Sequence, residues 1–240
     1  MSITAILNAY RRPHTIKAQI ESLRNQTVKP DEIWVWRNYH PDFDIDLPSL
    51  QVDKYCDSNT NWKYFGRFAF GLLAKTDFVA YFDDDTIPGN RWFENCLETY
   101  EKTKGIIGGV GLIQNDKINY MNHTRYGWPS NNEEIVQVDL VGHAWFVKKE
   151  YLGLVWAEEP ATYETAEDMH LSYICQKYGG INTYVPPHPE SNKSLSSSLR
   201  GYELGIDSTT DSVINHQRFF SLRDKCLQEY VSRGWYLICS

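Results

Sequence analysis

Four apolar runs in the first third of the chain have the length and composition of buried strands. They cover residues 3–7, 32–36, 52–56 and 78–82. Between the first two runs, Ile16, Ile20 and Leu23 repeat at helical spacing and predict an amphipathic helix, and a second helix is expected over residues 66–75. Strands that alternate with helices through short connections indicate βαβ units, so we predict an α/β fold with a largely parallel central sheet flanked by helices.

The second half of the chain is less regular. Its predicted helices span residues 91–104, 165–178 and 216–232, and its predicted strands span residues 106–113, 136–147 and 181–185, of which the middle one has room for two. Residues 190–211 are rich in Ser, Gly and Thr and predict a mobile loop, whereas residues 234–239 predict an apolar C-terminal anchor. Because neither an internal repeat nor a domain boundary is visible, we expect residues 1–240 to form a single domain.

Charge and composition argue against several classes of protein. The 240 residues carry a formal charge of −7 with a pI near 5.5, which argues against a nucleic-acid binder and against docking to anionic lipid. No apolar run approaches the roughly 18 residues of a membrane span, and the first residues lack the features of a signal peptide. Five cysteines without CxxC spacing indicate free thiols in a reducing compartment, so we expect a soluble cytoplasmic protein.

The most informative segment is the acidic triplet Asp83, Asp84 and Asp85, which directly follows the buried strand over residues 78–82. Alternate side chains share one face of a strand, so Asp83 and Asp85 should point the same way from its C-terminal end. In open α/β sheets this end binds ligands. Clustered carboxylates there are best explained by a cation with oxygen ligands, Mn²⁺ or Mg²⁺, and a hydrated charged turn is the alternative.

Four segments in order resemble the nucleotide-sugar glycosyltransferases of the GT-A fold, a Rossmann-like architecture, and especially the family-2 type. They are residues 5–13, residues 19–33, the DxD-like Phe82–Asp85 with Pro88, and the ED-like Glu167-Asp168 leading to Gly180. The resemblance implies a nucleotide-binding half over residues 1–104 and an acceptor-side half over residues 105–189, followed by the loop and helix of residues 190–240. The ending at Arg233-Gly234-Trp235 also resembles small glycosyltransferase domains of large algal viruses, which would place the protein in a host cytoplasm.

Under this resemblance the acidic triplet holds the divalent cation, which neutralises the departing diphosphate. Asp85 would be the metal ligand, and Asp83 would contact the metal or the ribose. Asp84 would face away on an ideal strand, but because the strand ends here its side chain could rotate toward the donor. His188 is a further metal-ligand candidate or else a surface histidine, and His143 would lie near a sugar or be a half-buried strand residue.

Five residues besides the triplet would bind the nucleotide: Asn8, Tyr10, Arg12, Asn38 and Arg67. Tyr10 would pack on the base or else in the core. The guanidinium groups of Arg12 and Arg67 would face the diphosphate or else solvent. Asn38 departs from the family, which has Asp here, and its amide could still bond a uracil edge. The resemblance favours UDP, and the departure leaves GDP open.

Asp168 corresponds to the family's catalytic base, which would take the proton of the acceptor hydroxyl, and Glu167 is the neighbouring candidate. The segment from Thr165 to Asp168 also has the pattern of a helix capping box, which is the structural alternative. The implied activity is metal-dependent transfer of a sugar, hexosyl or pentosyl, from a nucleotide-sugar to a hydroxyl of a glycan or glycoconjugate, with inversion.

Three other functions stay open. They are a retaining glycosyltransferase on the same fold, an inactive carbohydrate-binding module, and a sugar-1-phosphate nucleotidyltransferase. The last would need a glycine-rich loop after the first strand, where residues 8–13 carry no glycine. Donor sugar, acceptor and oligomeric state cannot be derived from the sequence.

Overall fold

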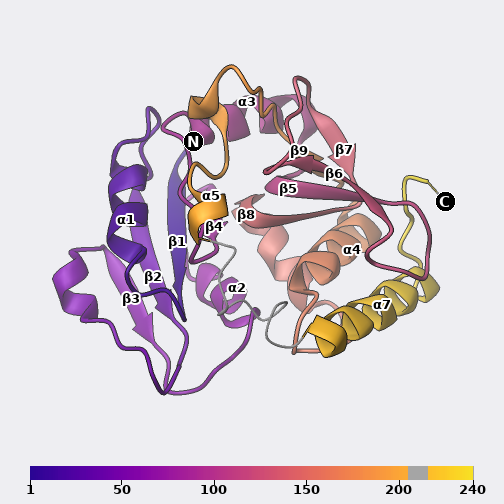
Figure 1. Ribbon diagram of the computed structural model, residues 1–240, viewed down its shortest axis with the longest axis horizontal. Helices are drawn as coiled ribbons and strands as arrows, with labels where there is room; N and C mark the ends of the chain where they lie inside the picture. The colour runs from indigo at the N-terminus through magenta and orange to yellow at the C-terminus, as the bar shows by residue number, and fades with distance from the viewer. Residues whose placement is uncertain (205–215, 240) are drawn as a thin grey trace.

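The computed structural model describes residues 1–204 and 216–239 (Figure 1). Its strands are β1 (Ile3–Ala9), β2 (Glu32–Arg37), β3 (Lys54–Asp57), β4 (Phe78–Phe82), β5 (Ile106–Gln114), β6 (His123–Gly127), β7 (Val136–Val138), β8 (Leu140–Lys148) and β9 (Thr183–Val185). Its α-helices are α1 (Ile16–Arg24), α2 (Gly66–Gly71), α3 (Trp92–Thr103), α4 (Glu167–Gly179), α5 (Gly201–Leu204) and α7 (His216–Ser232). Three 3₁₀ helices are η1 (Leu47–Leu50), η2 (Lys149–Trp156) and η3 (Lys193–Leu195).

Within the described residues these strands form one sheet in the order β3-β2-β1-β4-β8-β5-β9-β7, with β6 paired to β5. Strands β3, β2, β1 and β4 are parallel, as predicted. Beyond β4 the sheet is mixed, because β8 is antiparallel to both β4 and β5, so the prediction of a largely parallel sheet holds for the first half only. Antiparallel neighbours need only short connections, and the chain between β5 and β8 has no crossover helix.

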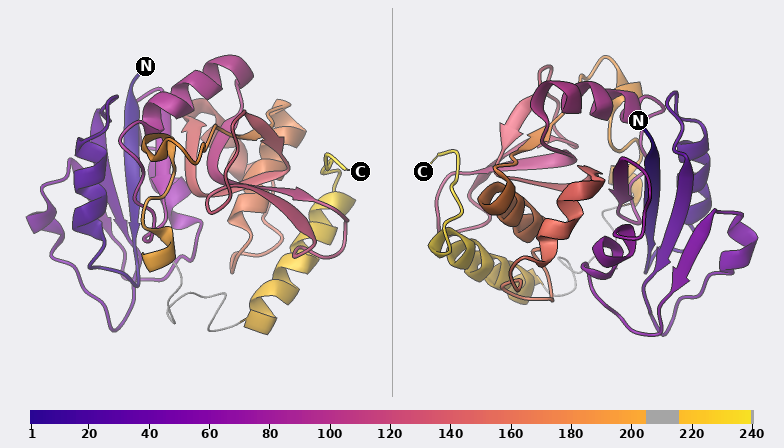
Figure 2. Two further views of the ribbon diagram at one scale, coloured as in Figure 1. Left: turned by 45° about the horizontal axis from the view of Figure 1, so that its top comes forward. Right: turned by 180° about the vertical axis from the view of Figure 1, so that it is seen from behind.

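Helices cover both faces of the sheet (Figure 2). Along β4, Phe78 and Phe82 join the core under α1 and α3, whereas Val79 and Tyr81 join the core under α2, α4 and α7. The alternation follows from the two-residue period of a strand. All five residues of β4 are buried, which explains its uninterrupted apolar sequence.

The structure corrects the predicted mobile loop over residues 190–211. Residues 190–204 form a packed segment that contains η3 and α5, and the remainder of the predicted loop lies outside the described residues. Ser197 is fully buried and donates from Oγ to the Gly109 carbonyl at 3.1 Å, and Gly89 N–H donates to the Ser196 carbonyl. Small side chains let the two backbones approach closely, and a Cβ on Gly109 would lie 2.5 Å from that of Ser197. The low hydrophobicity of residues 190–204 therefore did not indicate that they form a packed segment.

Other boundaries differ modestly from prediction. The predicted helix over residues 66–75 ends at Gly71, residues 136–147 form two strands, and β6 was missed because its sequence is mostly polar. The C-terminal helix and the apolar anchor are confirmed, with Trp235 and Leu237 buried. No helix in the described part of the chain has the length and apolar character needed to cross a membrane.

The close packing of β5 against β8 gives a stability prediction. A Cβ on Gly108 would lie 2.2 Å from the Cβ of Val141, so Gly108→Ala forces the strands apart. We expect it to lower the free energy of unfolding by about 1–3 kcal/mol, measured by chemical denaturation. Gly153→Ala is the matched control, because its Cβ would meet nothing within 4 Å. Equal stability of the two variants would contradict the packing argument.

Candidate active site

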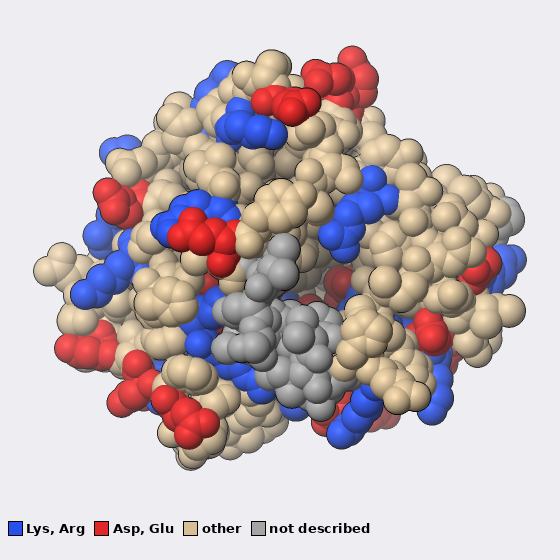
Figure 3. Space-filling model, in the orientation of Figure 1, with Lys and Arg blue, Asp and Glu red and all other residues tan. Residues whose placement is uncertain are grey.

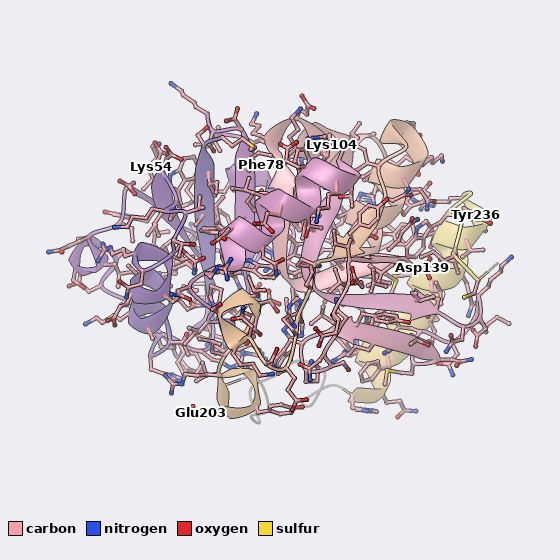
Figure 4. The ribbon with its side chains drawn as sticks, turned by 90° about the horizontal axis from the view of Figure 1, so that it is seen from above. Lys54, Phe78, Lys104, Asp139, Glu203 and Tyr236 are labelled. Carbon is pink, nitrogen blue, oxygen red and sulfur yellow. The ribbon has the colours of Figure 1, made fainter. Side chains whose placement is uncertain are left out.

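A cavity of about 300 Å³ lies at the C-terminal ends of β1, β2 and β4. It is lined by the loop after β1, residues 61–64, the acidic triplet, β8, and the N-terminal parts of α4 and α7. In Figure 4, Lys54 and Phe78, which begin β3 and β4, lie at the end of the strands away from Glu203 of α5. The cavity is lined by Asn8, Asn38 and Asp83, which lie at the end of β1 and directly after β2 and β4. The cavity therefore lies at the edge where parallel strands bind ligands.

Asp83 and Asp85 point to the same side, as the sequence predicted, and His143 of β8 joins them. One ligand atom from each of the three lies within 4.8 Å of the others, and His143 Nδ1 is 4.0 Å from Asp85 Oδ1. Antiparallel pairing of β4 with β8 places His143 here, since its carbonyl accepts the Asp83 N–H at 3.0 Å. His143 has a φ of 64°, which is unusual for a non-glycine residue. Residues with such backbone angles cluster at functional sites.

Asp84 faces away from this group and does not rotate toward it. Its Oδ1 accepts a hydrogen bond from Arg12 Nη1 at 2.6 Å, and its Oδ2 accepts one from the Arg11 N–H at 3.2 Å. Arg12 Nη1 is also 3.9 Å from Asp85. Burial raises the pKa of Asp84 to about 6, against the opposing effect of Arg12. Asp84 therefore holds the loop after β1 in place, and both Asp84 and Arg12 line the cavity. Arg12 is a buried, paired residue rather than a surface arginine.

Arg67 joins the two acidic motifs. It donates from Nη1 to Asp83 Oδ1 at 2.5 Å and from Nη2 to Glu167 Oε1 at 3.1 Å, and it stacks on the Trp145 ring at 4.4 Å. Only 2% of Arg67 is exposed, and it does not line the cavity. The prediction that Arg67 faces the diphosphate is therefore wrong, because hydrogen bonds to the two carboxylates hold its guanidinium in the interior, outside the cavity lining.

Asn8, Tyr10 and Asn38 line the cavity on the side of β1 and β2. The Tyr10 ring is half-buried on the cavity wall rather than in the core, and its hydroxyl accepts a hydrogen bond from Asn61 Nδ2 at 2.8 Å. The Asn38 amide donates to Asn61 Oδ1 and accepts the Trp62 N–H at 2.9 Å. Asn38 therefore shapes the loop that borders the cavity, and its predicted bond to a base competes with these contacts.

Glu167 and Asp168 begin α4 and line the same cavity as the triplet. The N-cap is Ala166, with φ 63° and no side-chain capping bond, so the capping-box alternative is wrong. Asp168 Oδ1 accepts the Met169 N–H at 2.8 Å, and Oδ2 accepts Arg223 Nη2 at 2.6 Å. Burial raises the pKa of Glu167 to about 7, Asp168 adds to the rise, and Arg67 opposes it.

His188 lies elsewhere, which corrects its prediction as a metal ligand. It is 3% exposed, its Nδ1 contacts the Pro186 carbonyl at 2.8 Å, and its Nε2 contacts Ser197 Oγ at 3.0 Å. Nε2 therefore holds the packed segment over residues 190–204 through Ser197, whereas Nδ1 contacts the chain just before that segment. The surface alternative is wrong as well, because the ring is buried beside Trp92.

The buried His188 predicts a stability change with pH. Burial lowers its pKa to about 4, against the opposing effect of the Pro186 carbonyl, so the unfolded chain binds more protons between about pH 6.5 and pH 4. The free energy of unfolding should therefore fall as pH falls through this window, by up to roughly 3 kcal/mol. Denaturation of wild type and His188→Gln at several pH values checks this, since the variant should lose that part of the slope. Parallel slopes would contradict it.

Sequence reasoning missed several residues that line the cavity. They are Tyr120, Arg125, Phe219, Phe220 and Arg223. None belongs to a recognisable motif. The available signal was that Phe219 and Phe220 lie close to Arg223 on the predicted C-terminal helix. The sequence predicted that His143 lies near a sugar, and it did not predict His143 as a metal ligand.

The Asp83–Asp85–His143 group has the chemistry of a divalent-cation site. Two carboxylates suit Mg²⁺ and Mn²⁺, and an added imidazole favours a first-row transition ion such as Mn²⁺ over Mg²⁺. Asp83 and Asp85 also directly follow a strand whose five residues are all buried. The residues therefore fit the cation that the sequence predicted, without defining its identity.

The sequence comparison decides the family. Residues 4–152, more than half of the chain, match the profile described as "Glycosyl transferase family 2". The chain belongs to glycosyl transferase family 2. In this family-2 chain the matched range contains β1, the acidic triplet and His143, whereas Asp168 and Arg223 lie beyond it.

The solved structures bear out the fold of this glycosyltransferase. It is similar to the "Crystal structure of S. aureus TarS", with a TM-score of 0.55 and 15% sequence identity. The match covers 78% of this chain and 37% of TarS, so this chain spans little more than a third of that protein. No curated protein matches the sequence. The likeness to algal-virus domains stays a prediction.

Proposed function

We propose that this glycosyltransferase moves a sugar from a UDP-sugar to a hydroxyl of a glycan or glycoconjugate with the help of a divalent cation, and that it inverts the anomeric carbon. The observation that carries the proposal is that both acidic motifs face one cavity. The acidic triplet, Glu167 and Asp168 all line it, and Arg67 bonds to one acid of each motif.

The donor side would use residues 1–104, with Asn8 and Tyr10 toward the nucleoside and Arg12 toward the diphosphate. All three line the cavity, and Tyr10 offers a half-buried ring for stacking on a base. Asp83, Asp85 and His143 would hold Mn²⁺ or Mg²⁺, which supplies positive charge near the departing diphosphate. Residues 105–189 would form the acceptor side, with α7 added to it.

Asp168 would act as the general base. Its carboxylate takes the proton of the acceptor hydroxyl while that oxygen attacks the anomeric carbon. The bond from this carbon to the diphosphate oxygen breaks, and UDP leaves with the bonding electrons. A single displacement of this kind inverts the carbon. Glu167 is the neighbouring candidate for the base, and its contact with Arg67 favours a supporting role.

Calorimetric titration of UDP, GDP and their common sugar conjugates, with Mn²⁺ and with excess chelator, tests the proposal. We expect one nucleotide to bind tightly with Mn²⁺ only, and its sugar conjugate to be hydrolysed slowly in the absence of acceptor. Binding without hydrolysis of any conjugate would favour the carbohydrate-binding alternative. Absence of nucleotide binding under both conditions would contradict the donor site altogether.

A further inference from the structure

Helix α7 packs beside α4 (Figures 1 and 2), and its residue Arg223 lines the cavity. Its Nη2 donates to Asp168 Oδ2 at 2.6 Å, and its Nη1 lies 3.3 Å from Thr165 Oγ1. The guanidinium lies over the Tyr120 ring at 4.2 Å. All four residues line the cavity, and only 4% of Arg223 is exposed.

This contact determines how the Asp168 carboxylate is oriented. Oδ1 is held by the Met169 N–H and Oδ2 by Arg223, so rotation about the terminal bond of the side chain would break both hydrogen bonds. Each carboxylate oxygen has two lone pairs, so each keeps one for a further donor. The planar fork of an arginine fixes this orientation better than the point charge of a lysine would.

Asp168 Oδ2 lies close to Gly142 of β8. A Cβ on Gly142 would meet one atom within 4 Å, which is Asp168 Oδ2 at 3.9 Å. Gly142 lines the cavity, so the absence of a side chain there leaves the cavity open beside the carboxylate. A larger side chain at this position would fill that space.

We propose that Arg223 is a positioning residue for the reaction, holding Asp168 so that a lone pair of Oδ2 faces the acceptor hydroxyl. The inference rests on the proposed function, in which Asp168 is the base. Arg223 keeps its own protons throughout, and the hydroxyl proton passes to Asp168. The C-terminal helix is then part of the active site, although it lies outside the range matched by the family profile.

The test compares Arg223→Gln, Arg223→Lys and Lys225→Gln. Lys225 is the matched control, because it lies two residues further along α7 and is exposed. The assay is metal-dependent hydrolysis across a panel of UDP- and GDP-sugars, with water in the place of the acceptor, together with calorimetric binding of UDP and Mn²⁺. We expect Arg223→Gln to lower kcat about 10- to 100-fold with the UDP affinity unchanged, since misplacement of a reacting group has effects of this size. Arg223→Lys should recover part of the rate, and Lys225→Gln should match wild type.

A second measurement separates positioning from a purely structural role. In the Asp168→Asn background, Arg223→Gln should lower hydrolysis by less than about twofold, because there is no carboxylate left to position. The double variant carries no charge at either position, so it also avoids the unpaired buried guanidinium of a single variant. A further loss equal to that in wild type would overturn the inference, as would wild-type kcat in Arg223→Gln. If the wild-type protein hydrolysed no donor, the proposed function would fail, and this inference with it.

Discussion

Asp85→Ala is expected to abolish the metal-dependent part of nucleotide binding. Asp85 supplies one of the two carboxylates in the Asp83–Asp85–His143 group, so the variant keeps one carboxylate and one imidazole. The Mn²⁺ affinity should fall at least about 100-fold, since even partners of metal ligands contribute 10- to 100-fold. Calorimetry with Mn²⁺ should then give the same UDP affinity for Asp85→Ala as wild type shows with chelator.

Asp57→Ala is the matched control for this variant. Asp57 ends β3 at the same edge of the sheet, but it pairs with Arg37 outside the cavity. Its replacement should leave Mn²⁺ and UDP affinities within about twofold of wild type, as is usual for a surface pair. Retention of Mn²⁺-dependent UDP binding by Asp85→Ala would show that the acidic triplet is a charged turn after all.

Asp168→Asn is expected to lower sugar transfer by roughly 10²- to 10⁴-fold, the usual contribution of a general base. The amide keeps the size of the carboxylate and one oxygen that can accept from Arg223, but it cannot take up a proton. Donor and Mn²⁺ binding should stay close to wild type, because Asp168 is not part of the Asp83–Asp85–His143 group. Steady-state kinetics and calorimetry on the same preparation give both quantities.

Loss of an ion pair can also unfold the protein, so stability must be measured alongside activity. Asp168→Asn leaves the buried Arg223 without a full counter-charge, and a loss of up to about 3–5 kcal/mol is the usual range for breaking such a pair. Circular dichroism at the assay temperature controls for this. Wild-type transfer by a folded Asp168→Asn variant would exclude Asp168 as the base and direct attention to Glu167.

The sequence predicted the parts of the site that depend on local patterns. The two-residue period of β4 placed Asp83 and Asp85 on one side, and the resemblance to family 2 predicted that the triplet and Asp168 face one site. The parallel half of the sheet followed from the alternation of strands and helices. These features depend on neighbours in the chain or on motifs of fixed order.

Contacts between distant segments could not be predicted. His143 reaches Asp83 through antiparallel pairing of β8 with β4, and the register of that pairing decides that this histidine, and not His188, joins the acids. Arg223 reaches Asp168 because two helices pack together, which leaves no trace in either sequence segment. The segment over residues 190–204 is held by backbone hydrogen bonds and small side chains, so hydrophobicity carried no signal for it.

Basic and acidic residues are interspersed on the face drawn in Figure 3. The buried charges near the cavity are different, because each arginine there has fixed partners. Arg67 in particular binds Asp83 on the proposed donor side and Glu167 on the proposed acceptor side. For enzyme engineering, this shared guanidinium means that donor and acceptor preferences cannot be redesigned independently. A library that varies Asp83 should also vary Arg67 and Glu167. Replacing one carboxylate changes the net charge around the shared guanidinium, and this changes the environment of the other carboxylate.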